Sequence, residues 1–129
     1  IEINGNAIRE MENAYPALYR TAFKMAGDAV EVAEFLPDTY FDVVYSMAAI
    51  MHIHPAGADS LFKNMARISR RYICTIENES ARTVYIFPRN YQEIFEGLGL
   101  KQIFQQEMHP ALVGETYKDY RVRIFERRS

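Results

Sequence analysis

The stretch Phe41–Pro55, FDVVYSMAAIMHIHP, decides the fold. Its first five residues are apolar except for Asp42, and two β-branched valines lie in the middle. This composition predicts a strand over Phe41–Tyr45 that is buried on both faces, as strands of parallel sheets usually are. Ser46–Ile53, which follows directly, predicts a loop or a helical turn. The stretch therefore indicates a covered parallel sheet with a turn at the end of one of its strands.

Helical spacing and short apolar runs alternate on both sides of this stretch. The expected helices lie over Ile8–Tyr15, Ala29–Leu36, Ala58–Arg71 and Tyr91–Leu98, and the first is expected to end at Tyr15-Pro16. The expected strands lie at Ile1–Ile3, Ala22–Ala26, Tyr72–Ile76, Leu100–Gln106 and Tyr120–Glu126. Such alternation predicts an α/β fold with βαβ units and a mostly parallel sheet flanked by helices. The last two strands, joined by His109–Asp119, are expected to add an antiparallel C-terminal strand.

Composition narrows the class of protein. The 129 residues, 25% charged and 49% hydrophobic, suit one domain. A net charge of −2 gives too weak a field for a dedicated nucleic-acid binder, and the longest apolar run, Met47–Met51, is too short to cross a membrane. The single cysteine, Cys74, excludes an internal disulfide and suits a reducing compartment. We therefore expect a cytoplasmic protein with a small-molecule substrate and neither nucleic acid nor membrane as a partner.

Ligands of α/β sheets bind outside the carboxyl ends of the strands. The site is therefore expected at Glu2–Asn4, Gly27–Ala29, Ser46–His54 and Glu77–Glu79. Glu2 and Asp28 are acids at the ends of the first two expected strands, where a carboxylate can accept hydrogen bonds from a ribose diol or an adenine amine. The alternative is that Glu2 is an exposed carboxylate and that Asp28 caps the helix after it.

The central stretch also resembles a known family. Asp42-Val43-Val44-Tyr45-Ser46, followed by Ala49-Ile50-Met51-His52-Ile53, is similar to the fourth strand of the class I S-adenosylmethionine-dependent methyltransferases. The resemblance covers essentially the whole chain. It implies a Rossmann-like, mostly parallel sheet, S-adenosylmethionine as the cofactor, and methyl transfer to an acceptor that the sequence does not identify.

The resemblance also assigns roles to residues. It implies that Glu2 binds the ribose hydroxyls, that Asp28 meets the adenine amine, and that His52 is the catalytic base. It places four further residues beside the cofactor, namely Ile3, Ala29, Ser46 and Met47. Arg82, Tyr85, Arg89 and Tyr91 would line the acceptor pocket. A structural role for His52 and a solvated loop around Arg89 remain alternatives.

One part of the family pattern is missing. The first strand and the glycine-rich cofactor loop would precede Ile1, and Gly97-Leu98-Gly99 does not replace them because it follows a helix and precedes a strand. The missing strand would lie in the centre of the sheet and leave open edges. We therefore expect residues 1–129 to be a single, incomplete domain. It would be truncated, or completed by a second chain or in a homodimer.

Two other functions stay open. One is a non-catalytic, methyltransferase-like interaction module that has lost cofactor binding. The other is a metal-dependent enzyme in which His52 and His54 share an ion, with Glu77 or His109 completing the ligands. Pro55 directly after His54 argues against that site, and no metal ligand is assigned.

Overall fold

The computed structural model describes residues 1–128, which form two compact units. The first unit is Ile1–Leu36, and the second begins at Pro37. The expected single domain over residues 1–129 stays a prediction. Residue 129 lies outside the described part of the chain. Among the described helices, none is both long and apolar enough to cross a membrane.

The first unit contains three short helices, α1 (Gly5–Ala14), α2 (Pro16–Thr21) and α3 (Ala29–Glu34). Asn4 caps α1, since its side chain accepts a hydrogen bond from the Asn6 backbone N–H. Pro16 was expected only to end the first helix, but it also begins α2. A proline fits the first position of a helix because the N–H that it lacks would be unpaired there.

The two strands expected in the first unit are reduced to one parallel bridge between Glu2 and Ala26. The Glu2 N–H donates to the Met25 carbonyl at 3.0 Å, and the Gly27 N–H donates to the Glu2 carbonyl at 3.1 Å. The expected parallel direction of these two segments is therefore present. The two segments do not form strands of the expected length, because two short segments that pair only with each other are rarely stable as strands.

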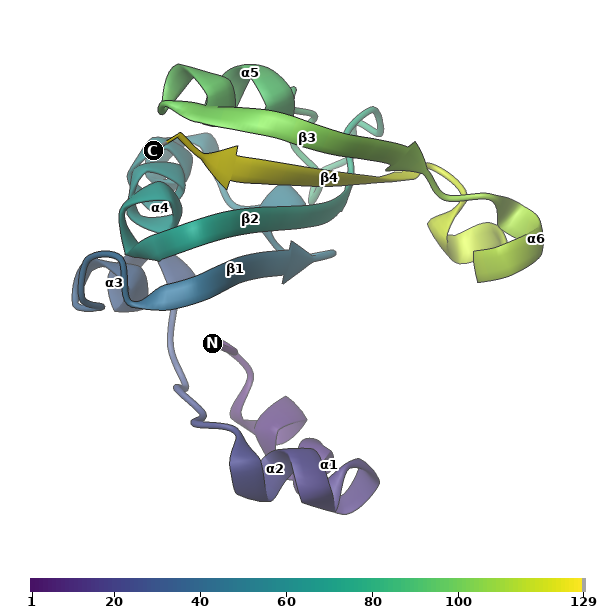
Figure 1. The fold of residues 1–129 in the computed structure, drawn as a ribbon. Helices are drawn as coiled ribbons and strands as arrows, with labels where there is room; N and C mark the ends of the chain where they lie inside the picture. Colours follow the sequence, from purple (N-terminus) through teal and green to yellow (C-terminus); the bar gives the residue numbers. More distant parts are fainter. Residues whose placement is uncertain (129) are drawn as a thin grey trace. The chain divides into compact units, whose positions relative to one another are not determined.

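The second unit is built on a four-stranded sheet in the order β1-β2-β4-β3 (Figure 1). The strands are β1 (Phe41–Met47), β2 (Ser69–Asn78), β3 (Leu100–Glu107) and β4 (Tyr120–Arg127). The pair β1–β2 is parallel, whereas β4 runs antiparallel to both β2 and β3. The α/β class and the antiparallel C-terminal strand are thus confirmed.

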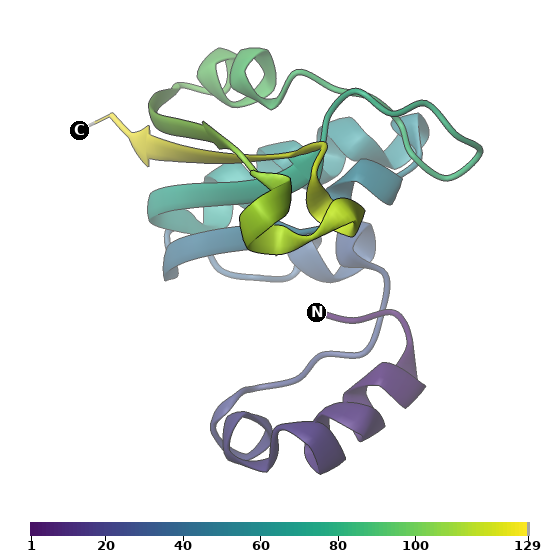
Figure 2. The same ribbon diagram turned by 90° about the vertical axis from the view of Figure 1, so that its right-hand side faces the viewer.

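Helices α4 (Pro55–Ile68) and α5 (Tyr91–Gly97) pack against the sheet (Figures 1 and 2). Their apolar positions and one face of β2 and β4 form the core. It includes Leu61, Phe62, Met65, Ile73, Tyr91, Phe95 and Phe125, all of which are buried. The ring centroids of Phe95 and Phe125 lie 5.0 Å apart, so these two side chains pack α5 against β4. This core fixes the strands whose ends carry the candidate site.

Three short helical segments lie in the connections. η1 (Ile50–His52) follows β1, while α6 (Pro110–Val113) and η2 (Glu115–Tyr117) lie between β3 and β4. In Figure 1, α6 lies beyond the edge of the sheet at which β1, β2 and β3 end.

The prediction that β1 is buried on both faces is wrong. Its alternate residues Phe41, Val43, Tyr45 and Met47 are exposed, from 36% at Phe41 to 73% at Tyr45. These residues alternate with Val44 and Ser46, which lie in register with buried residues of β2. Because β1 is the end strand of the second unit's sheet, its outer edge and one apolar face lie open in the described part of this unit. A local run of apolar residues does not reveal how many neighbours a strand has.

Candidate functional site

The candidate site of the second unit lies where β1 and β2 end and β4 begins (Figure 1). The seven residues Ser46–His52 at this edge comprise the last two residues of β1, two connecting residues and η1. We call this segment the anchored turn, because two charged side chains hold its backbone from opposite ends.

Glu77, near the end of β2, holds the first end of the anchored turn. Its side chain is fully buried. The carboxylate accepts hydrogen bonds from the Ser46 hydroxyl at 2.6 Å, the Ala49 N–H at 3.0 Å and the Met51 N–H at 3.3 Å. The Ala48 N–H donates to the Ile76 carbonyl at 2.9 Å. A single carboxylate thus satisfies donors that a tight turn would otherwise leave unpaired.

Arg89 holds the other end. Its guanidinium donates to the Ile50 carbonyl at 3.0 Å and also to the Ile53 carbonyl. It lies over the ring of Phe62, 5.5 Å from the ring centroid. The short helix η1 therefore has an acid at its N–H end and a cation at its carbonyl end, an arrangement that the peptide dipoles favour.

Burial sets the electrostatic state of Glu77. Desolvation raises the pKa of this carboxyl, because water no longer stabilises the charged form. The hydrogen bonds from Ser46 and from the backbone of the anchored turn oppose this shift. The donors to Glu77 are neutral groups, so hydrogen bonds alone compensate the buried charge.

Ser46 and Met47, both predicted to lie beside the cofactor, differ in exposure. Ser46 is buried; its hydroxyl donates to Glu77 and accepts from the Ile50 N–H at 3.3 Å. Met47 is exposed on the other face of β1. The Ser46 hydroxyl is therefore used inside the protein, whereas the Met47 side chain can reach a ligand.

His52, the predicted base, lies exposed at the end of the anchored turn. Its Nδ1 is 2.6 Å from the Tyr85 carbonyl oxygen. A carbonyl only accepts, so Nδ1 carries the proton and Nε2 has a free lone pair in the neutral ring. His54 instead accepts from the Ala56 N–H at 3.2 Å as the cap of α4. Over residues 1–128, the structure has no group of three or more side chains suited to hold a metal ion.

The other predicted cofactor residues, Glu2, Ile3, Asp28 and Ala29, belong to the first unit. Its parallel bridge places Glu2 and Asp28 toward the same end of the paired segments. Glu2 Oε1 accepts from the Asn4 N–H, and Asp28 Oδ1 accepts from the Val30 N–H, both at 2.8 Å. Asp28 is thus also a helix cap. Each local bond uses one carboxylate oxygen and leaves the second for a ligand.

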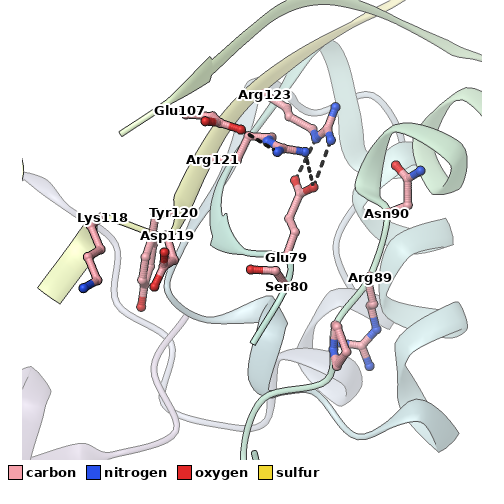
Figure 3. A pocket seen from close by; sticks show the side chains of 11 residues that line it. Glu79, Ser80, Arg89, Asn90, Glu107, Lys118, Asp119, Tyr120, Arg121 and Arg123 are labelled. Carbon is pink, nitrogen blue, oxygen red and sulfur yellow. Dashed lines mark hydrogen bonds and ion pairs between the residues drawn. The ribbon is translucent and has the colours of Figure 1, made fainter. Parts of the chain in front are cut away.

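Sequence reasoning identified these loops but missed the anchors. It named Glu77 as part of the strand-end segment Glu77–Glu79 and as a possible metal ligand, and it placed both Arg89 and Tyr91 in an acceptor pocket. Tyr91 lies fully buried between Phe62 and Phe95. Arg89 does line a cavity, which Figure 3 shows together with Glu79 and the arginines of β4. No local signal marks Glu77, because its partners lie 26 to 31 residues away.

Comparisons with known proteins agree on the fold. No protein-family model matches the sequence, and no curated protein does. Among solved structures, a SAM-dependent methyltransferase from Archaeoglobus fulgidus aligns with a TM-score of 0.70 at 15% identity, over 97% of this chain and 73% of its own. A putative sarcosine dimethylglycine methyltransferase from Galdieria sulphuraria aligns with a TM-score of 0.70 at 13% identity, over 97% and 67%. Magnesium protoporphyrin IX methyltransferase from Synechocystis PCC 6803 aligns with a TM-score of 0.70 at 11% identity, over 96% and 59%.

These likenesses define the class of fold. The chain has the fold of class I S-adenosylmethionine-dependent methyltransferases, as the resemblance of Phe41–Pro55 implied. At 11% to 15% identity the likeness concerns the fold, and the reaction has to be argued from residues.

Proposed function

We propose that this chain carries part of a methyltransferase domain that transfers a methyl group from S-adenosylmethionine to a small molecule. The anchored turn is the observation that carries the proposal, because it is built at the sheet edge where α/β proteins bind ligands. The fold supports the same function: the Synechocystis neighbour and a Burkholderia thailandensis N-methyltransferase were solved with bound S-adenosylhomocysteine.

The residues fit the nucleoside part of this cofactor. Ribose hydroxyls and the adenine amine are hydrogen-bond donors, and the second carboxylate oxygens of Glu2 and Asp28 are acceptors. In this proposal Ile3 and Ala29 lie beside the nucleoside, and the cofactor contacts of Ser46 and Met47, which belong to the second unit, stay a prediction. When bound, the cofactor supplies a methyl group on a sulfonium sulfur.

His52 is the proposed base. Its Nε2 takes a proton from the acceptor as the acceptor gains the methyl group, and the Tyr85 carbonyl holds the ring in the required tautomer.

We also propose that a further strand completes the sheet along β1. The open edge of β1 and the exposed side chains of Val43, Tyr45 and Met47 support this, because long apolar edge strands rarely stay unpaired. The strand would come from a longer polypeptide that contains this chain, from a second chain, or from a second copy. The single Cys74 and the weak net charge support a cytoplasmic protein that binds neither nucleic acid nor membrane.

Calorimetric titration of the full-length protein with S-adenosylhomocysteine tests the proposal. A ligand at 100 times its dissociation constant should raise the free energy of unfolding by about 2.7 kcal/mol. No heat and no thermal stabilisation from the folded protein would reject cofactor binding.

Two variants test the assigned acids. Asp28→Asn keeps a good helix cap but removes one acceptor, and Glu2→Gln does the same for the other contact. Each should weaken S-adenosylhomocysteine by about 1–3 kcal/mol, since a donor of the bound nucleoside loses its acceptor. Glu12→Gln, an exposed acid on α1, is the matched control. Equal affinity of all three variants would remove both acids from the site.

One observation favours the alternative of a non-catalytic interaction module. The exposed apolar residues of β1 suit a protein partner as well as a completing strand. Stable capture of a partner by a protein that binds no S-adenosylhomocysteine would favour this function.

A further inference from the structure

A cavity of about 510 Å³ lies at the same edge of the second unit's sheet. Residues after β2, at the end of β3 and at the start of β4 line it (Figure 3). Its volume suits a small molecule, since ligand pockets commonly measure about 300–1,000 Å³. Ten of its eleven lining residues are polar or charged, and Pro88 is the exception. This composition predicts a polar ligand.

The inner wall carries excess positive charge. Glu79 accepts two hydrogen bonds from Arg123, at 2.7 and 2.9 Å, and one from Arg121 at 3.4 Å. The side chains of Arg123 and Glu79 are 4% and 9% exposed. One buried carboxylate therefore serves two guanidinium groups. Arg89, which also lines the cavity, donates to backbone carbonyls. In Figure 3, Glu79 points between the two β4 arginines.

Exposed acids balance this charge only at the rim. Glu107 lies 2.8 Å from Arg121 but is 73% exposed, and Glu115 lies 2.9 Å from Lys118 but is 79% exposed. Asp119 is also exposed. Exposed ion pairs contribute little, because water and salt screen them. A ligand anion can therefore replace Glu107 at Arg121 and Glu115 at Lys118.

We infer that this cavity binds the methyl acceptor through an oxyanion group of the acceptor, a carboxylate or a phosphate, held by Arg121 and Lys118. The acceptor role rests on the proposed function, whereas the anion site is tested without methyl transfer. The planar fork of an arginine matches both oxyanions, and lysine adds a point charge.

The probes are succinate and inorganic phosphate, titrated into the full-length protein and followed by NMR shifts of the Arg121 and Lys118 side chains. Chloride at matched ionic strength controls for screening. Arg121→Gln should weaken the better probe about tenfold or more, because hydrogen bonds to charged groups are strong. Lys118→Gln should weaken it by about two- to fivefold, and Glu107→Gln should strengthen it by a similar factor by removing a competing acid.

Arg70→Gln is the matched control, since Arg70 is an exposed, ion-paired arginine of β2 outside the cavity. Equal weakening by Arg70→Gln and Arg121→Gln, or chloride shifts equal to those of both probes, would overturn the inference. If Arg121→Gln does not fold, the other two variants test the inference, because Lys118→Gln should weaken probe binding and Glu107→Gln should strengthen it. A preference between the two probes distinguishes a carboxylate from a phosphate acceptor.

S-adenosylhomocysteine separates this inference from the proposed function. It should bind together with the probe, because donor and acceptor occupy the site at once. Displacement of the probe would overturn the acceptor assignment by giving the cavity to the cofactor. If the probe binds with the expected variant effects, the anion site is supported even when the protein binds no S-adenosylhomocysteine. The lack of S-adenosylhomocysteine binding would then count against the proposed methyl transfer and not against the anion site.

Discussion

Glu77 and Glu79 are two residues apart near the end of β2, yet they are stabilised in different ways. Glu77 is fully buried and accepts hydrogen bonds from neutral groups of the anchored turn. Glu79 lies between Arg121 and Arg123. One carboxylate thus organises a backbone, whereas the other neutralises buried cations. Substituting each by glutamine removes the charge, keeps the shape, and measures the two roles separately.

The largest effect is expected for Glu79→Gln. Arg123 would keep a buried charge without its counter-ion, and breaking a buried ion pair costs about 3–5 kcal/mol. Urea unfolding measures the loss. Glu107→Gln removes an exposed acid from the same network and should cost less than about 1 kcal/mol. Equal losses for both variants would show that Glu79 is not the counter-ion that holds the two arginines.

Glu77→Gln should cost less, about 1–3 kcal/mol, because no cation is left unpaired. The amide oxygen can still accept from Ala49 and Met51, and the Ser46 hydroxyl can rotate to accept from the new amide N–H. Urea unfolding again gives the value. A loss larger than that of Glu79→Gln would reverse the comparison and make the anchored turn the more important element for stability.

The sequence predicted the four strands of the second unit and the antiparallel C-terminal strand, because these follow from local periodicity, and it offered the helix cap of Asp28 as an alternative. It did not predict that one face of β1 is exposed or that Glu77 and Arg89 anchor a turn. Those features depend on contacts between distant segments, and an apolar run or a strand-end acid looks the same in either setting. The part that Arg121 and Arg123 play in lining the cavity was missed for the same reason.

The pH dependence of stability tests the burial of Glu77 by itself. Burial raises the pKa of Glu77 in the folded state, so between the unfolded and folded values the folded protein binds the extra proton. Its contribution to stability is therefore fully present below the unfolded pKa, about 4.3 for a glutamate, and is lost as the pH rises through the folded pKa. Unfolding free energies of the wild type and Glu77→Gln, measured from pH 4 to 8, should show this loss as a difference between them. A constant difference would show that Glu77 has the same pKa in both states.

A smaller effect than that of Glu77→Gln is expected for Ser46→Ala, about 1 kcal/mol, because it removes one donor from Glu77 and one acceptor from the Ile50 N–H. The Ser46 hydrogen bond lowers the pKa of Glu77 against the effect of burial, so its loss should raise that pKa further. The pH range over which the wild type loses this contribution to stability should then move to higher pH in Ser46→Ala. Ser46→Ala combined with Glu77→Gln should show no such pH-dependent loss. If this pH range is the same in Ser46→Ala as in the wild type, the backbone N–H groups of Ala49 and Met51 alone compensate the buried charge.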